Sequence, residues 1–154
     1  MSRAKVGDPV PSFSLTADDD GVVSDEALAG RRYVLYFYPK DDTPGCTVQA
    51  CSLRDEWDRV AATGSEIFGV SPDSVASHVK FRAKYDLPYR LLSDEGHRLA
   101  DALGVWVEKS FAGRTFKGIE RTTFVISGER KIEHVLARVK PGEHVDQLLE
   151  VLAA

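Results

Sequence analysis

Residues 36–51 read YFYPKDDTPGCTVQAC, and this stretch decides the fold that the rest of the chain is expected to build. The aromatic and β-branched run over residues 33–38 is typical of a buried strand, and Pro39 ends it because proline cannot donate a hydrogen bond within a central sheet. The acidic pair that follows is typical of a turn. Thr43 can then serve as the N-cap of a helix that begins at the next residue, a proline. The stretch therefore predicts a strand, a turn and a helix with Cys46 in its first turn.

The predicted position of Cys46 has a chemical consequence. The N–H groups in the first turn of a helix have no partner within the helix and carry partial positive charge. A thiolate there accepts hydrogen bonds from these groups, so the site favours the deprotonated, nucleophilic form of cysteine. The spacing alone leaves a buried structural cysteine open as the alternative, because free cysteines are commonly buried. Cys46 is therefore a candidate nucleophile.

The composition limits the class of protein. The chain has 154 residues, and we expect a single domain over residues 1–154 with a sizeable core. A hydrophobic content of 43% and a charged content of 29% are typical of soluble globular proteins, and the net charge of −4 argues against a nucleic-acid partner. The sequence has no apolar run of the roughly 20 residues that span a bilayer, and its start lacks the apolar core of a signal peptide. We expect a cytoplasmic protein without a membrane or nucleic-acid partner.

The two cysteines, Cys46 and Cys51, lie in one predicted helix. In an intact helix their Cα atoms would be roughly 8.7 Å apart, whereas disulfides rarely exceed about 6.8 Å. A static bridge is therefore not expected. A transient bridge requires this part of the helix to unwind, after which a sulfenic acid on Cys46 can condense with Cys51.

A metal site is the weaker interpretation of the cysteine pair. Two thiolates are half of the four ligands that a structural zinc ion needs. The histidines are scattered without paired spacing, at His78, His97, His134 and His144. The acidic run over residues 18–21 lacks the ligand spacing of a calcium-binding loop. We expect neither a metal ion nor a cofactor.

The rest of the chain alternates between strand and helix patterns. Strands are predicted over residues 9–15 (at an edge, because of its prolines), 66–71, 89–93, 121–126 and 132–139, and helices over 44–63, 72–85, 97–103 and 142–154. Residues 18–23 predict a turn in an N-terminal hairpin, and residues 108–118 a loop or loose hairpin. In the 72–85 helix, Val75, Val79 and Ala83 share the expected apolar face. This order predicts an α/β, thioredoxin-like sandwich with a mixed central sheet, helices on both faces and an N-terminal β-hairpin.

The segment YPKDDTPGCT, residues 38–47, resembles the peroxiredoxins, and more narrowly the peroxiredoxin Q, or bacterioferritin comigratory protein, subfamily. The resemblance spans nearly the whole chain. Further matching segments are FGVSPDS (68–74), LLSD (91–94), GVW (104–106) and GIERTTF (118–124).

The resemblance implies roles for five residues. Cys46 matches the peroxidatic cysteine that attacks the O–O bond, and Cys51 matches the resolving cysteine of members that keep it in the same helix. Thr43 matches the threonine that orients the peroxide, and Pro39 the proline that shields the thiolate from water. Arg121 matches the arginine that stabilises the thiolate and the transition state. Without the resemblance, a surface charge at a strand edge is the simpler interpretation of this arginine.

The resemblance therefore implies a thiol peroxidase for hydrogen peroxide and organic hydroperoxides. Its Cys46–Cys51 disulfide would be reduced by thioredoxin or a similar dithiol, and we expect a monomer because both thiols are in one chain. Gln49 departs from the glutamate of many relatives, and we expect little effect on the chemistry. Two other functions stay open: a dithiol–disulfide oxidoreductase acting on protein thiols, and a non-enzymatic redox sensor or holdase.

Overall fold

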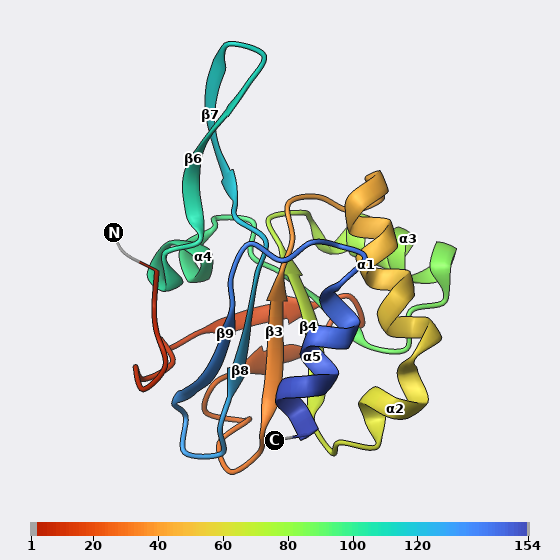
Figure 1. The fold of residues 1–154 in the computed structure, drawn as a ribbon, viewed down its shortest axis with the longest axis vertical. Helices are drawn as coiled ribbons and strands as arrows, with labels where there is room; N and C mark the ends of the chain where they lie inside the picture. Colours follow the sequence, from red (N-terminus) through yellow and green to blue (C-terminus); the bar gives the residue numbers. More distant parts are fainter. Residues whose placement is uncertain (1–2, 154) are drawn as a thin grey trace.

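Strand β3 (Tyr33–Phe37) lies at the centre of the structure, and all five of its residues are buried. The computed structural model describes residues 3–153. β3 pairs in parallel with β4 (Glu66–Ser71) and antiparallel with β8 (Thr122–Ile126), so the central sheet is mixed, as predicted. Within the described residues the sheet has the order β2-β1-β5-β4-β3-β8-β9 (Figure 1), and its other strands are β1 (Ser14–Ala17), β2 (Val22–Ser24), β5 (Arg90–Ser93) and β9 (Ile132–Leu136).

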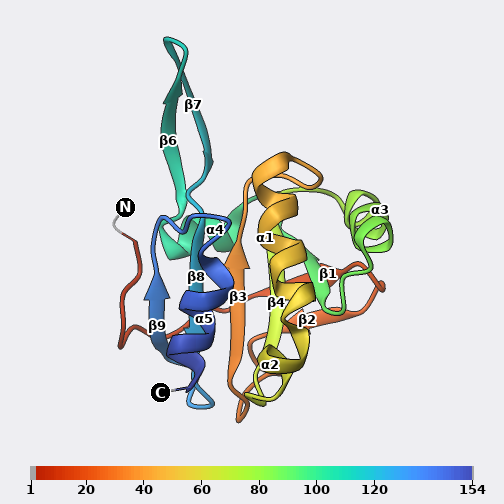
Figure 2. The ribbon, with the colours of Figure 1, turned by 45° about the vertical axis from the view of Figure 1, so that its right-hand side comes forward.

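Helices cover the two faces of the sheet unequally. Alternate residues of β3 divide between two cores, with Val34 and Tyr36 on one side and Leu35 and Phe37 on the other. The side of Leu35 and Phe37 is covered by α4 (Arg98–Leu103) and the N-terminal segment. The first side is covered by α1 (Pro44–Asp55), α2 (Trp57–Ala61), α3 (Val75–Tyr85) and α5 (His144–Ala153), of which α1 and α5 lie side by side (Figure 2).

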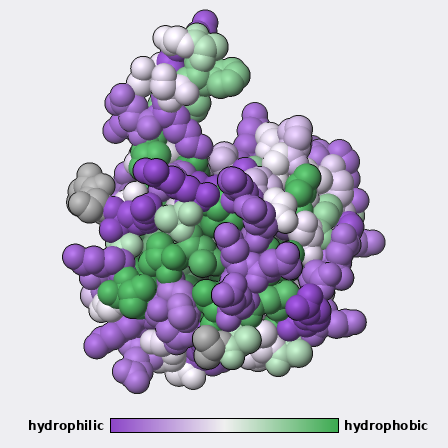
Figure 3. Space-filling view, in the orientation of Figure 1, coloured by the Kyte–Doolittle hydropathy of each residue, from purple (hydrophilic) through white to green (hydrophobic). Residues whose placement is uncertain are grey.

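A second, two-stranded sheet projects from this sandwich. β6 (Trp106–Phe111) and β7 (Arg114–Ile119) form a regular antiparallel hairpin that rises clear of the rest of the molecule (Figure 1). The sequence predicted a loop or loose hairpin here, because its residues are mostly polar. Phe111 and Phe116 are 76% and 48% exposed, and Figure 3 shows apolar side chains towards the tip.

The predicted strand over residues 9–15 is wrong in position and in neighbours. β1 begins only at Ser14, after both prolines, and it lies between β2 and β5 rather than at an edge. β2 is the edge strand, and the two strands form the expected N-terminal hairpin. The prolines stay outside the ladder because they cannot donate to it.

Two helix predictions also need correction. The predicted 44–63 helix breaks at Glu56, whose backbone angles (φ −102°, ψ 19°) leave the helical range, so α1 and α2 are separate. In α3 the buried side chains are His78 and Phe81, whereas Val79 is 47% exposed. The pattern failed there because it treated a histidine as a surface residue.

Among residues 3–153, no helix has both the length and the apolar character needed to cross a bilayer.

Candidate active site

The start of α1 follows the predicted geometry. Thr43 is the N-cap (φ −96°, ψ 157°), and its carbonyl accepts the first helical hydrogen bond, from the N–H of Thr47 at 2.8 Å. Pro44 is the first helical residue, so Cys46 is the third. The Thr43 hydroxyl does not cap the helix but donates to the carbonyl of Lys40 at 2.9 Å. This bond closes the short loop that carries Pro39 and Thr43 from β3 to the cysteine.

Cys46 is a buried free thiol, with 2% of its surface exposed. Arg121 reaches it from the far part of the chain, and the guanidinium Nη2 donates to the Cys46 sulfur at 3.4 Å. The register of β3 and β8 explains this meeting, since Phe37 pairs with Thr122. The residue before Thr122 therefore lies where β3 ends and the loop towards Cys46 begins.

Arg121 lies closely against the first turn of α1. A Cβ atom at Gly45 would be 3.3 Å from the Nη2 atom of Arg121 and 3.4 Å from the Cγ atom of Pro141. Any side chain at this position would therefore press on the guanidinium. The glycine next to Cys46 allows the arginine to approach the sulfur.

Gln49 had no predicted role in the site, but the structure places it there in contact with Arg121. It is fully buried, and its Oε1 accepts a hydrogen bond from Nη1 of Arg121 at 2.5 Å. Arg121 thus uses one nitrogen for Gln49 and the other for Cys46. The signal in the sequence was the three-residue spacing from Cys46, which places both side chains on one helix face. Because Gln49 is neutral, it orients the guanidinium without cancelling its charge.

The charge of Arg121 contributes to lowering the pKa of two further ionisable groups. Burial and the nearby Arg121 guanidinium lower the pKa of Lys109, a half-buried residue of β6, while Cys46 acts in the opposite direction. Burial, followed by the Arg121 charge, lowers the pKa of His144 to about 3. His144 is therefore neutral at physiological pH. Lys109 was not predicted, since its position depends on where β6 leaves the rest of the molecule.

His144 and Tyr36 form the buried layer next to this site. His144 Nε2 lies 2.8 Å from the Thr123 hydroxyl, and its ring centroid is 5.6 Å from that of Tyr36. Burial raises the pKa of Tyr36 well above its usual value. Both groups are therefore uncharged, which leaves the positive charge of Arg121 and Lys109 dominant around the sulfur of Cys46.

Cys51 remains separate from Cys46. It is a half-buried free thiol on the same helix, and α1 is continuous between the two residues. Of the five predicted residues, the structure brings Cys46 and Arg121 into contact and places Thr43 and Pro39 on the adjoining loop. It keeps Cys51 more than one helical turn away, the arrangement that geometry predicts for an unbridged pair.

One group of side chains within residues 3–153 has metal-like geometry. Ligand atoms of Asp41, Asp73 and His78 all lie within 4.8 Å of one another. Hydrogen bonds account for this arrangement, because His78 Nδ1 contacts Asp41 and the Asp73 carboxylate accepts from the N–H of Asp41 and the hydroxyl of Ser71. The group therefore needs no ion to explain it.

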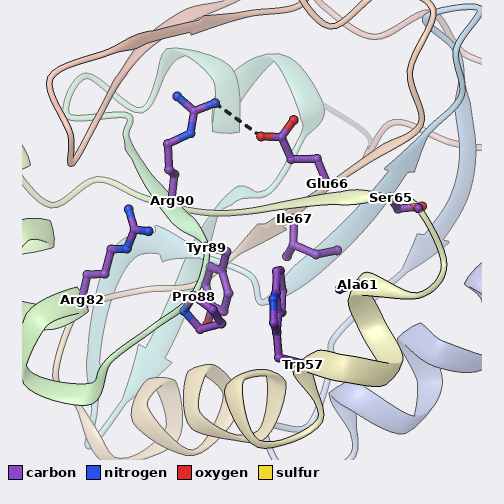
Figure 4. Close-up of a pocket in the computed structure, with 10 residues that line it drawn as sticks. Trp57, Ala61, Ser65, Glu66, Ile67, Arg82, Pro88, Tyr89 and Arg90 are labelled. Carbon is purple, nitrogen blue, oxygen red and sulfur yellow. Dashed lines mark hydrogen bonds and ion pairs between the residues drawn. The ribbon is translucent and has the colours of Figure 1, made fainter.

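A pocket of about 340 Å³ lies at the other end of α1 (Figure 4). The rings of Trp57 and Tyr89, with centroids 5.6 Å apart, form part of its wall. The Tyr89 hydroxyl also donates to the carbonyl of Ala50 at 3.1 Å, so this wall supports the middle of α1. The cations that line the pocket are already paired, Arg82 with Asp18 at 3.0 Å and Arg90 with Glu66 at 3.3 Å.

A buried cysteine at a helix start, in contact with an arginine, on an α/β sandwich, defines a thiol-based redox protein of the thioredoxin-like class. Comparisons with known proteins agree with this class of protein. The profile of the AhpC/TSA family matches residues 6–135. Putative peroxiredoxin bcp of Coxiella burnetii is 44% identical over 145 residues, covering 94% of this chain and 96% of that protein. Peroxiredoxin Bcp of Escherichia coli is 44% identical over 152 residues, covering 99% and 97%.

A solved structure of the bacterioferritin comigratory protein of Xanthomonas campestris superimposes with a TM-score of 0.86 at 36% identity, covering 92% of this chain and 90% of that one. The chain belongs to the AhpC/TSA family and, within it, to the peroxiredoxins of the Bcp and Q kind. It is therefore a thiol-dependent peroxidase. The predicted thioredoxin-like fold and the predicted family are both confirmed.

Proposed function

We propose that Cys46 is the peroxidatic residue of a thioredoxin-dependent, two-cysteine cycle in which Cys51 resolves the oxidised form. The observation that carries this proposal is the contact of Arg121 with the Cys46 sulfur at 3.4 Å. A buried thiol that faces a permanent positive charge is suited to react as a thiolate. The alkyl peroxide reduction activity named for the Xanthomonas campestris relative supports hydrogen peroxide and organic hydroperoxides as substrates.

The first step is a displacement at oxygen. The Cys46 thiolate attacks one peroxide oxygen, the O–O bond breaks, and the other oxygen leaves as water or an alcohol after taking up a proton. The sulfur is oxidised to a sulfenic acid while the peroxide is reduced. Negative charge develops on the leaving oxygen, so donors fixed around it lower the barrier. Arg121 and the Thr43 hydroxyl are the donors we assign to this task, the hydroxyl once it turns away from the carbonyl of Lys40. Pro39 keeps water from the thiolate.

The second step forms a disulfide. The Cys51 thiol loses its proton and attacks the Cys46 sulfenic sulfur, and the displaced hydroxide takes up that proton and leaves as water. The intact α1 keeps the two residues too far apart to bridge. The helix must therefore unwind between them. A dithiol protein such as thioredoxin would then reduce the disulfide and allow α1 to form again.

Two variants test the assignment, with peroxide consumption measured in the presence of thioredoxin and its reductase. We expect Cys46→Ser to lose all turnover, because no sulfur remains to accept oxygen. Cys51→Ser is expected to react once and then to recycle poorly. Turnover by Cys46→Ser would contradict the mechanism, and normal cycling by Cys51→Ser would show that another thiol resolves the sulfenic acid.

We also propose that the protein acts as a monomer in the cytoplasm. Both reacting thiols lie on one helix of one chain, so the cycle needs no second subunit. A reducing compartment keeps such a pair available for catalysis. Light scattering of the reduced and oxidised protein tests the first part, and a dimer mass in both states would contradict it.

A further inference from the structure

Asp41 is a buried carboxylate in the loop that joins β3 to α1. It is 7% exposed, and its two oxygens meet three side-chain partners. The Tyr38 hydroxyl donates to Oδ1 at 2.6 Å, and the Ser77 hydroxyl donates to Oδ2 at 2.8 Å. His78 Nδ1 lies 2.7 Å from the same Oδ2, and His78 is fully buried. Two of these partners come from α3, so Asp41 joins this loop to that helix.

The His78 ring has an acceptor at each nitrogen. Nε2 lies 3.0 Å from the carbonyl of Leu92, which has no hydrogen to donate, so Nε2 must carry a proton. A second proton must then lie between Nδ1 and the Asp41 carboxylate, since otherwise two lone pairs would face each other at 2.7 Å. The contact is therefore a hydrogen bond with one proton between Nδ1 and the carboxylate.

The titratable groups that face His78 are few and can be named. Asp41 is its direct partner, Asp73 belongs to the same cluster within 4.8 Å, and the Tyr38 ring centroid is 6.4 Å from the His78 ring. Burial, followed by the Asp41 charge, raises the pKa of Tyr38 well above its usual value. Tyr38 therefore stays a hydrogen-bond donor to Asp41.

The same loop carries the peroxide site on its other side. The N–H of Asp41 donates to Asp73 at 2.8 Å, and the next residue, Asp42, accepts from Lys84 at 2.8 Å and from the Tyr85 hydroxyl at 2.7 Å. α3 thus holds both aspartates, and the residue after them is the N-cap Thr43. The Asp42 contacts are exposed and weak, whereas the Asp41 contacts are buried.

We propose that the buried Asp41–His78 pair is a positioning device that holds the loop of residues 39–43 on α3 and so sets how readily α1 unwinds for disulfide formation. The proposal rests on the function proposed above. While the pair is intact, the loop and the first turn of α1 keep the geometry that binds peroxide. When the pair is broken, the loop separates from α3, and the unwound form that lets Cys46 reach Cys51 becomes more populated.

The test compares variants that all keep the catalytic residues. Asp41→Ala combined with His78→Leu removes both members of the pair and leaves no buried charge unpaired, although the hydroxyls of Tyr38 and Ser77 lose their acceptor. Circular dichroism checks that each variant folds. His78→Leu alone breaks the pair and leaves Asp41 its two hydroxyl donors. Asp101→Asn is the matched control, because Asp101 pairs with His97 at 2.9 Å in an exposed contact away from the loop.

The first measurement is amide hydrogen exchange of residues 41–51 in the reduced protein without peroxide. We expect exchange about tenfold faster in His78→Leu and in the double variant, the effect of losing one hydrogen bond to a charged group. Asp101→Asn should match the wild type. Unchanged exchange in the folded double variant would overturn the proposal. This measurement needs no peroxidase activity, so its outcome does not depend on whether the proposed function is correct.

The second measurement separates the two chemical steps in a single turnover. The double variant should form the Cys46–Cys51 disulfide about tenfold faster after sulfenic acid formation. Asp101→Asn should form it at the wild-type rate. Equal rates in the double variant and the wild type would overturn the proposal. A wild type that forms no disulfide at all would instead contradict the proposed function.

Discussion

At the scale of single residues, the site depends on how Arg121 is oriented. Its two terminal nitrogens are divided between Gln49 and the Cys46 sulfur, and Gly45 leaves the space in which the guanidinium lies. A planar guanidinium can serve two partners at once, which a lysine ammonium cannot do in the same geometry. Gln49 holds this orientation without opposing the charge of the guanidinium.

We predict that Arg121→Ala folds and loses about a hundredfold in the rate of Cys46 oxidation, since removing one transition-state donor has an effect of this order. Arg121→Lys should recover only part of the rate, because it restores the charge but not the planar donor set. Stopped-flow measurement of the first step checks both. Arg138→Ala is the control, since Arg138 is 79% exposed. Equal rates for Arg121→Ala and the control would exclude Arg121 from the site.

His144 provides a prediction on stability. Its pKa falls from 6.5 to about 3 on folding because the ring is buried. The unfolded chain therefore binds one more proton between these values, and the folded state loses about 1.4 kcal/mol per pH unit as pH falls below about 6.5. His144→Gln should remove this contribution. Urea unfolding from pH 7 to pH 4 measures it, and identical slopes for variant and wild type would contradict the assignment.

At the scale of elements, the proposed cycle gives α1 two tasks that oppose each other. Its wound form presents Cys46 in the first turn, and the unwound form that we propose allows the bridge to Cys51. The helix is supported in its middle by Tyr89, which donates to the Ala50 carbonyl, and near its end by Arg54, which donates to the Tyr85 carbonyl at 2.8 Å. The proposed cycle requires these contacts to loosen each time the bridge forms.

We predict that oxidation lowers the helical circular-dichroism signal by an amount that corresponds to roughly one to two turns. The reason is the distance between Cys46 and Cys51 in the intact helix. Cys51→Ser treated in the same way should keep its signal, because it cannot form the bridge. An oxidised, disulfide-bonded wild type with the full reduced-state signal would contradict the unwinding of α1.

The sequence predicts most of α1 and little of what surrounds it. The strand, turn and helix of residues 36–51 follow from local patterns, and so does the place of Cys46. Arg121 is 75 positions away and required the family resemblance, since no periodicity identifies it. His78 contacts Asp41 across 37 positions. A hydrophobicity pattern counts histidine as polar and therefore cannot detect such a buried pair. For this reason the buried face of α3 was predicted wrongly.

At the scale of the whole molecule, stability comes from two cores on either side of one sheet. Phe124 of β8 is fully buried, and its ring meets that of Phe37 edge to face at 6.0 Å. The β6–β7 hairpin has its own small sheet and exposes Phe111. The sequence could not predict this hairpin's shape, because neither strand has a buried face to impose alternation.

We predict that Phe124→Ala lowers the free energy of unfolding by about 3–5 kcal/mol, because it opens a cavity in a fully buried core. Phe111→Ser should change it by less than about 0.5 kcal/mol, since that ring is exposed. Chemical denaturation of both variants checks the contrast. Equal effects would show that the hairpin contributes to the cooperative core.

The most direct test of the central claim is the intact mass of the reduced protein after one equivalent of hydrogen peroxide. The account predicts a loss of about 2 Da, because Cys46 and Cys51 form an intramolecular disulfide. A stable gain of about 16 Da would mean that Cys46 is oxidised but Cys51 does not resolve it. An unchanged mass would contradict the assignment of Cys46 as the residue that reacts with peroxide.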